Sequence, residues 1–203
     1  MKVILALVLA YLVGSIPFGY IMGKLFKHID IREYGSGNIG TANAFRVFGP
    51  PLALLVLLGD VGKGIGAIYL MRLLNINHPS ILAVAGLAVI IGHDWSIFLG
   101  FKGGKGVAAT FGVIAAFNLP VAILGGAIWL VLTLLTKYAS LASISSLTTM
   151  LIFMILFKQP REYVILSIIL LLLTVIRHRE NLRRLRLGEE RKISDKIEIK
   201  KKE

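Results

Sequence analysis

The segment at positions 101–106, Phe-Lys-Gly-Gly-Lys-Gly, places two lysines and three glycines between two strongly apolar stretches. Glycine lets backbone N–H groups approach an anion closely, and the N-terminus of a following helix favours negative charge. Lysine adds a compact positive charge. We therefore expect a phosphate-binding loop, although a loop that only fixes membrane topology by its charge is an alternative. Its candidate ligands are Lys102, Gly103, Gly104, Lys105 and Gly106.

A second polar segment, residues 35–46, combines glycines with small hydroxyl and amide side chains. Its glycines match the dinucleotide-binding spacing G-x-G-x-x-G, but no predicted strand precedes them, so the match alone is weak. Hydroxyl groups can donate to phosphate oxygens, and an arginine can bind an oxyanion with two N–H groups. A polar surface turn is the alternative. The candidate ligands are Gly35, Ser36, Gly37, Asn38, Gly40, Thr41, Asn43 and Arg46.

A third polar segment, residues 177–181, follows the last apolar stretch. If the helix continues there, His178 and Asn181 share one face, and Glu180 can pair with an arginine three or four residues later. A basic helix at the lipid surface is the alternative. His178 and Asn181 are the better functional candidates, because neither is needed to anchor charge. The arginines expected only to reach the lipid surface are Arg183, Arg184 and Arg186.

Several polar residues lie within apolar stretches. Asp60 and Lys63 are three residues apart and could form a pair inside the membrane, with a structural or a functional role. His93 ends an apolar stretch, where a histidine is more often structural than a base. Ser143 could face the polar segments. The chain has no cysteine, which excludes a thiolate nucleophile and a cysteine-ligated metal, and we predict no metal and no cofactor.

The composition indicates that these segments are positioned by membrane helices. The chain is 56% hydrophobic, with a mean hydropathy of +0.79. Its net charge of +12 would suggest nucleic acid for a soluble protein, but 11 of the 23 Lys and Arg residues follow the last apolar stretch. This pattern favours a cytoplasmic tail facing anionic lipid, and no nucleic-acid partner is expected.

Six apolar stretches approach the roughly 20 residues that a membrane span requires. The stretch 107–136 is interrupted by Asn-Leu-Pro at 118–120, and residues 107–118 would form a helix of roughly 18 Å, shorter than the roughly 30 Å membrane core. Broken helices of this kind occur near anion sites in membrane proteins. The stretches are 3–22, 51–74, 79–99, 107–136, 140–157 and 163–176.

Counting 107–136 as two spans gives an all-α integral membrane protein. We predict a bundle of seven transmembrane helices with the N-terminus outside, the C-terminus cytoplasmic and one short or broken helix near 107–118. This topology puts 18 Lys and Arg residues on the cytoplasmic side and four on the other. Residues 1–182 would form a single transmembrane catalytic bundle, and residues 183–203 a basic cytoplasmic tail.

Three motifs in order resemble the bacterial membrane glycerol-3-phosphate acyltransferases that use acyl phosphate as donor, the PlsY family. The motifs are GSGNIGTAN at 35–43, GHDWSIFLGFKGGKGVAAT at 92–110 and RHRENLRRLRLGEE at 177–190. The segments GDVGKG at 59–64 and SLASI at 140–144 also resemble that family. The resemblance covers almost the whole chain, up to about Glu189. It covers no part of the chain after Arg191, to which we assign no role.

The resemblance implies a reaction. The 1-hydroxyl of glycerol 3-phosphate attacks the carbonyl of acyl phosphate, giving 1-acylglycerol 3-phosphate (lysophosphatidic acid) and inorganic phosphate, the first step of phospholipid synthesis. It also implies a multi-pass protein of the cytoplasmic (inner) membrane, an active site facing the cytoplasm and an upstream enzyme that forms acyl phosphate. The chain lacks His-x4-Asp, the dyad of the larger acyl-CoA enzymes, so we do not expect CoA dependence.

The resemblance also implies residue roles. Lys105 and the amides around Gly103 and Gly104 would hold the phosphate of acyl phosphate. Arg46 would bind the phosphate of glycerol 3-phosphate, with His178 and Asn181. The base would be His178, whose arginine neighbours lower its pKa, or the phosphate of the substrate itself. The residues expected to cradle a phosphate or the oxyanion are Ser36, Gly37, Asn38 and Thr41. The residues assigned to catalysis are Ser36, Arg46, Lys105 and His178.

Two other functions remain open from the sequence. Glycine-broken helices and a buried lysine also suit a small transporter for phosphate or an organophosphate, but the halves show no internal repeat. A non-catalytic scaffold could bind anionic lipid through the basic tail. Deleting the tail after Arg191 would abolish the function of a scaffold and spare that of an enzyme.

Overall fold

Helices form most of residues 1–197, the part of the chain described by this computed structural model, and no β-strand occurs among them. Two short 3-10 turns, η1 (Ile31–Glu33) and η2 (Ile97–Leu99), lie between helices. The helices are α1 (Lys2–Ser15), α2 (Phe18–Lys27), α3 (Thr41–Phe48), α4 (Pro50–Leu73), α5 (Pro79–Asp94), α6 (Val107–Phe117), α7 (Leu119–Thr136), α8 (Ala139–Leu156), α9 (Arg161–Arg177) and α10 (Arg179–Leu187).

Four of these helices are long and apolar enough to cross a membrane: α4, α5 continued to Leu99, α7 and α8. The pair α1 and α2 makes a fifth candidate, bent by 41°. Large apolar side chains such as Leu54 and Leu134 remain exposed on the outer faces, as a lipid environment requires. Seven spans would require α6, with 11 residues, and α9, with 17, to cross as well.

The first apolar stretch, 3–22, which we expected to be one span, is not a continuous helix but is divided into α1 and α2. Pro17 lacks the N–H that would continue the hydrogen-bond ladder. The carbonyl groups freed at the break accept from side chains elsewhere in the bundle, one in the turn after α5 and one in α4. The Ser96 hydroxyl donates to the Ser15 oxygen at 2.6 Å, and the Lys63 ammonium donates to the Ile16 oxygen at 2.9 Å. This capping makes the break tolerable at membrane depth.

The predicted break within 107–136 is confirmed. Helix α6 ends one residue before Asn118, and α7 begins immediately after it. The side-chain oxygen of Asn118 accepts from the Val121 amide at 3.1 Å, and Pro120 lies in the first turn of α7, where no N–H partner is lost. The break therefore produces a short helix whose N-terminus follows residues 101–106, which we call the lysine–glycine loop.

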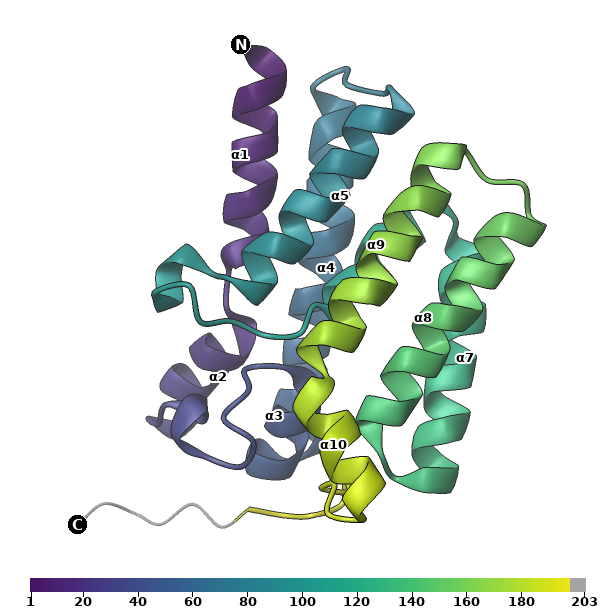
Figure 1. The fold of residues 1–203 in the computed structure, drawn as a ribbon. Coiled ribbons are helices and arrows are strands. Elements are labelled where there is room, and N and C mark those ends of the chain that lie inside the picture. Colours follow the sequence, from purple (N-terminus) through teal and green to yellow (C-terminus); the bar gives the residue numbers. More distant parts are fainter. Residues whose placement is uncertain (198–203) are drawn as a thin grey trace.

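The long helices run alongside one another, and the shorter helices α2, α3 and α10 gather at one end of the bundle (Figure 1). The N-terminus lies at the opposite end (Figure 1). Helices α4 and α6 touch backbone to backbone, since a Cβ atom at Gly64 would lie 2.4 Å from the Ala109 oxygen and one at Gly112 would lie 2.1 Å from the Val61 oxygen. Their contact holds the lysine–glycine loop beside the end of the bundle.

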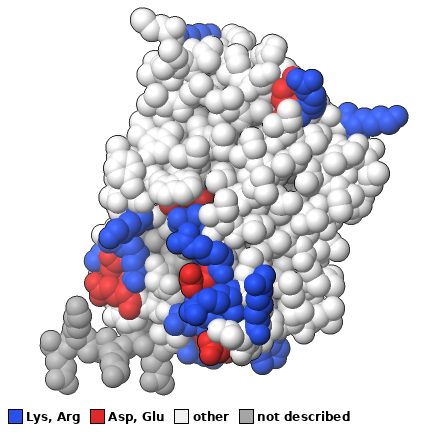
Figure 2. Space-filling model, in the orientation of Figure 1, with Lys and Arg blue, Asp and Glu red and all other residues white. Residues whose placement is uncertain are grey.

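Charged side chains collect at the same end. Figure 2 shows Lys, Arg, Asp and Glu concentrated where α2, α3 and α10 lie, below a broad band of uncharged surface. We call this the charged end of the bundle. The separation of an apolar band from a charged end matches a protein embedded in a membrane.

Candidate active site

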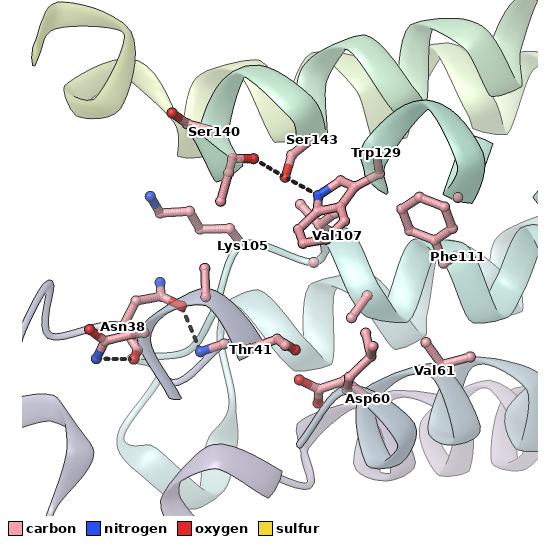
Figure 3. Close-up of a pocket in the computed structure, with 18 of the residues that line it drawn as sticks. Asn38, Thr41, Asp60, Val61, Lys105, Val107, Phe111, Trp129, Ser140 and Ser143 are labelled. Atoms are coloured by element: carbon pink, nitrogen blue, oxygen red, sulfur yellow. Dashed lines mark hydrogen bonds between the residues drawn. The ribbon is translucent and has the colours of Figure 1, made fainter. Parts of the chain in front are cut away.

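A cavity of about 550 Å³ opens between α3, α4, α6, α7, α8 and the segment around α10. Figure 3 shows Lys105, Ser140, Asn38 and Thr41 around one part of it, and Trp129, Phe111 and Val61 toward another. Its polar side chains are Ser36, Asn38, Thr41, Asn43, Arg46, Asp60, His93, Lys105, Ser140, Ser143, His178, Asn181 and Glu190. Its larger apolar side chains are Leu57, Leu58, Val61, Phe111, Ile123, Trp129 and Leu130. All three predicted polar segments therefore contribute to one cavity.

The loop before α3 is shaped by Asn43. The side-chain oxygen of Asn43 accepts from the Ser36 amide at 2.9 Å, and its nitrogen donates to the Asn38 oxygen at 2.9 Å. Gly35 has φ +62°, and a Cβ atom there would lie 2.3 Å from the Asn43 oxygen. Gly35 and Gly37 do not line the cavity. The structure thus gives Gly35 and Gly37 a role in loop shape away from the cavity, whereas Asn43 both shapes the loop and borders the cavity, so its substrate contact stays a prediction.

Thr41 offers the unpaired donor of this loop. It is the first residue of α3, where the leading N–H groups have no acceptor within the helix. Its buried hydroxyl faces the cavity and has no hydrogen-bond partner among the described residues. Gly40 also borders the cavity, and its amide donates to the Asn38 side chain at 2.8 Å. A helix N-terminus with an unpaired hydroxyl is suited to an anion or a substrate hydroxyl.

Arg46 extends from the last turn of α3 and is buried, with 7% of its surface exposed. Its Nε and Nη2 donate to the backbone oxygens of Lys192 and Arg191, each at 2.9 Å. These bonds use two of the five N–H groups of a guanidinium. Burial lowers the pKa of Arg46, but an arginine remains charged at neutral pH. Three N–H groups are left for an oxyanion.

Lys105 brings a second cation into the cavity. Its ammonium donates to the side-chain oxygen of Asn181. Burial, aided by the nearby Arg184 and Arg177 and opposed by Glu190, lowers the pKa of Lys105 to about 8. Lys105 is therefore mostly protonated at neutral pH, and a bound anion would stabilise its charged form.

The rest of the lysine–glycine loop differs from our prediction. The amide of Gly104 donates to the His93 oxygen at 2.9 Å, so it is not free for phosphate. Cβ atoms at Gly103 and Gly104 would lie 2.1 Å from the His93 oxygen and 1.9 Å from its Nε2. These glycines therefore allow close packing. Lys102 is exposed and lies outside the cavity wall, whereas Gly106, with φ +72°, borders it.

His178 is a neutral acceptor in this arrangement. Burial and the nearby Lys105 lower the pKa of His178 to about 4. Its Nδ1 lies 2.8 Å from the Thr174 oxygen, which can only accept, so Nδ1 carries the proton. Nε2 then has a free lone pair, which can accept from a substrate hydroxyl but is a poor base at neutral pH.

Glu190 is the functional residue that our sequence analysis missed. Its buried carboxylate accepts from Ser140 at 2.9 Å, from the Asn181 side-chain nitrogen at 2.6 Å and from Arg184 at 2.9 Å. The expectation that Arg184 only reaches lipid is therefore wrong. Because Glu190 holds the nitrogen of Asn181, the oxygen of Asn181 faces Lys105. The end of the third motif, Gly-Glu-Glu, was the available signal.

The predicted pair within α4 is confirmed and includes a histidine. Lys63 Nζ lies 2.8 Å from Asp60 Oδ1 and 2.8 Å from His93 Nδ1. All three side chains are buried, and Asp60 and His93 border the cavity. Since Lys63 also caps the break after α1, the cluster ties that break to the cavity wall. These contacts support the structural interpretation of His93.

Ser143 reaches the cavity, as predicted, but its hydroxyl is already engaged. It donates to the Ala139 oxygen at 2.6 Å and accepts from the Trp129 indole at 3.2 Å (Figure 3). The indole is thereby fixed at the wall of the cavity. In this arrangement Ser143 offers a lone pair rather than a donor.

Comparison with known proteins assigns this site to a family. The family model for glycerol-3-phosphate acyltransferase matches residues 4–188. The chain belongs to the glycerol-3-phosphate acyltransferase family. Over 192 residues it is 44% identical to the glycerol-3-phosphate acyltransferase of Caulobacter vibrioides, covering 95% of this chain and 88% of the relative. It is also 44% identical to that of Carboxydothermus hydrogenoformans, covering 94% of this chain and 96% of the relative.

Solved structures place the acyltransferase among integral membrane enzymes. The crystal structure of PlsY (YgiH), an integral membrane glycerol 3-phosphate acyltransferase, in its glycerol 3-phosphate form superposes with a TM-score of 0.89 at 36% identity, covering 95% of this chain and 96% of that one. The lysophosphatidic acid form of PlsY superposes with a TM-score of 0.87. The chain is thus a membrane acyltransferase of lipid biosynthesis, as its motifs indicated, and not a transporter or a scaffold.

Proposed function

We propose that this protein transfers an acyl group from acyl phosphate to the 1-hydroxyl of glycerol 3-phosphate. The observation that carries the proposal is a single cavity with two cations and several hydroxyl and amide groups at one part and apolar side chains at another. An anionic head group and an acyl chain would need such a division. The relatives support glycerol 3-phosphate as acceptor, and the solved product form supports lysophosphatidic acid as product.

Arg46, Lys105 and Asn181 would hold the phosphate of glycerol 3-phosphate. For Lys105 this replaces the phosphate of acyl phosphate, which the resemblance implied, because its ammonium donates to Asn181, a residue expected at the phosphate of glycerol 3-phosphate. The free hydroxyl of Thr41 and the N-terminus of α3 would receive the second anion, which is the phosphate of the donor or the oxyanion formed at its carbonyl. The donor's acyl chain would lie along the apolar part of the cavity, between Val61, Phe111 and Ile123 in α4, α6 and α7. The protein thereby positions two phosphates and an activated carbonyl.

The proton of the 1-hydroxyl would pass to the phosphate of glycerol 3-phosphate. That group has a second pKa of about 6, whereas the pKa of His178 is lowered to about 4. The hydroxyl oxygen then forms a bond to the carbonyl carbon, and the bond from that carbon to the donor's phosphate oxygen breaks. Inorganic phosphate leaves with the electron pair. His178 would orient the acceptor by accepting through Nε2 from its other hydroxyl, the one that does not react.

The donor would be acyl phosphate rather than acyl-CoA, because the chain lacks the His-x4-Asp dyad. Acyl phosphate is a mixed anhydride that already carries a phosphate leaving group. Two anion sites, one for each substrate, would therefore suffice to bind donor and acceptor. A separate enzyme must supply this reactive compound. We propose this enzyme as the functional partner, with the two phosphate substrates and membrane lipid.

We also propose seven spans in the cytoplasmic (inner) membrane, with α1 and α2 counted together and with α6 and α9 crossing. The N-terminus would lie outside and the charged end, with the active site, in the cytoplasm. The concentration of Lys and Arg at that end supports this orientation (Figure 2).

The test is product formation from labelled glycerol 3-phosphate and palmitoyl phosphate by purified protein. Lys105→Ala removes one of the two cations in the cavity, and Lys102→Ala removes the same charge from an exposed position on the same loop. We expect Lys105→Ala to lose at least about 100-fold in kcat/KM, as when one partner of a desolvated charge pair is removed, and Lys102→Ala to stay within about twofold. Equal losses in the two variants would show that only the net charge of the loop matters and would overturn the site assignment.

A further inference from the structure

Residues 191–197, which we call the C-terminal strap, cross the charged end of the bundle beside the cavity. The amide of Ile193 donates to the Lys137 oxygen at 2.8 Å, at the end of α7. The amide of Ile197 donates to the Arg46 oxygen at 3.0 Å, and the Ile197 side chain packs against the apolar cluster that contains Val47. The strap therefore joins the end of α7 to the last turn of α3. Our sequence analysis assigned this segment no role.

The strap holds the guanidinium of Arg46. The two backbone oxygens that accept from Arg46 belong to Arg191 and Lys192, which are the first two residues of the strap. A planar guanidinium fixed through Nε and Nη2 has one orientation, with its remaining N–H groups set in a fixed plane. Without these acceptors a long side chain regains rotamer freedom, and binding an anion must then restore its order.

A turn within the strap presents these oxygens. The carboxylate of Asp195 accepts from the Lys192 amide at 2.8 Å, and the Asp195 amide donates back to the Lys192 oxygen at 3.2 Å. The guanidinium of Arg191 donates to the Gly35 oxygen in the loop before α3. The strap is thus built onto the same loop and helix that carry Ser36 and Arg46.

We propose that the C-terminal strap is a positioning element that orients Arg46 for the phosphate of glycerol 3-phosphate. This inference rests on the proposed function. None of residues 191–197 lines the cavity, and the strap acts there through Arg46, so its loss should weaken the binding of glycerol 3-phosphate far more than that of acyl phosphate. The inference assigns a function in substrate affinity to residues beyond the 4–188 region that the family model matches.

Two truncations of the full chain test this. Ending the chain after Glu190 removes the strap but keeps the carboxylate that holds Asn181, and ending it after Ile197 keeps the strap. We expect the first to raise the KM for glycerol 3-phosphate about tenfold, with a kcat and a KM for palmitoyl phosphate within about twofold. The second should match the full chain. An unchanged KM for glycerol 3-phosphate in the first truncation would overturn the proposal.

A pair of point variants separates positioning from charge without shortening the chain. Asp195→Asn keeps an oxygen that can accept from the Lys192 amide, and Asp195→Ala removes it; both remove the negative charge. Positioning predicts a higher KM for glycerol 3-phosphate in Asp195→Ala and a near-normal one in Asp195→Asn. A purely electrostatic effect predicts that the KM for glycerol 3-phosphate falls equally in both variants, because both lose a negative charge and the acceptor substrate is an anion. That result would contradict the proposal. Absence of product from the full chain would instead refute the proposed function.

Discussion

The affinity for glycerol 3-phosphate should fall as the pH rises through the pKa of Lys105. Burial lowers the pKa of Lys105 to about 8 in the empty site, so the ammonium begins to lose its proton just above neutral pH. A bound phosphate favours the charged form and raises that pKa. Binding is therefore coupled to proton uptake above pH 8. The affinity for glycerol 3-phosphate is therefore highest below the pKa that Lys105 has without bound phosphate, and it falls above that pKa.

The size of the effect follows from the fraction of protein with a protonated Lys105. If only that form binds, the apparent KM scales with one plus ten raised to the difference between pH and pKa. With a pKa of about 8, the factor is about 1.1 at pH 7 and about 11 at pH 9, a rise of about tenfold. Over this range His178 stays neutral, because its pKa is about 4. The phosphate of the substrate, with a second pKa of about 6, stays dianionic.

The assay is the KM for glycerol 3-phosphate from pH 7 to pH 9 at saturating palmitoyl phosphate, with spontaneous donor hydrolysis subtracted. Lys105→Arg is the matched control, because an arginine keeps its charge throughout. The KM of this control for glycerol 3-phosphate should not change from pH 7 to pH 9, whatever its absolute value. A wild-type KM that changes less than twofold, or an Arg variant that follows the wild-type curve, would refute the role of the Lys105 charge.

Further predictions concern the general base, the lysine–glycine loop, independence of metal and the acyl chain. His178→Ala should lower kcat less than the roughly 100-fold expected for a lost general base; a larger loss at saturating substrate would restore the histidine as base. Gly104→Ala should lower the Tm clearly, because its Cβ would lie 1.9 Å from His93 Nε2, whereas Gly66→Ala, which meets nothing within 4 Å, should not. Activity should persist in excess EDTA, and inactivation reversed by a divalent metal would contradict this. Gly126→Leu should shift the preference toward shorter acyl phosphates, since Gly126 borders the cavity in α7; an unchanged chain-length profile would place the acyl chain elsewhere.

The sequence predicted the elements that bring the site together. The interruption at Asn118 indicated the break between α6 and α7, and the three polar segments do meet in one cavity. Residue type was sufficient to select Arg46, Lys105 and Asn181 as cavity residues, because a cation or an amide next to apolar helices has few structural uses. The bend at Pro17 was not predicted, since composition cannot show that side chains distant in the sequence cap the freed carbonyl groups.

The sequence could not tell which loop groups face the cavity. Lys102 and Lys105 are the same residue type in the same loop, and only the fold of the loop over His93 leaves Lys102 exposed and Lys105 half-buried at the cavity. The Gly104 amide looked available until its partner 11 positions earlier was known. Glu190 was overlooked because an acidic residue is unexpected in a phosphate site, and its function is to hold Asn181. These contacts depend on tertiary structure.

The most direct test of the central claim is a comparison of donors. Purified protein would receive labelled glycerol 3-phosphate with palmitoyl phosphate, with palmitoyl-CoA or with no donor, and both lysophosphatidic acid and inorganic phosphate would be measured. We predict lysophosphatidic acid only with palmitoyl phosphate, with one inorganic phosphate released per product. Turnover with palmitoyl-CoA at a comparable rate, or no product from folded protein with any donor, would contradict this account.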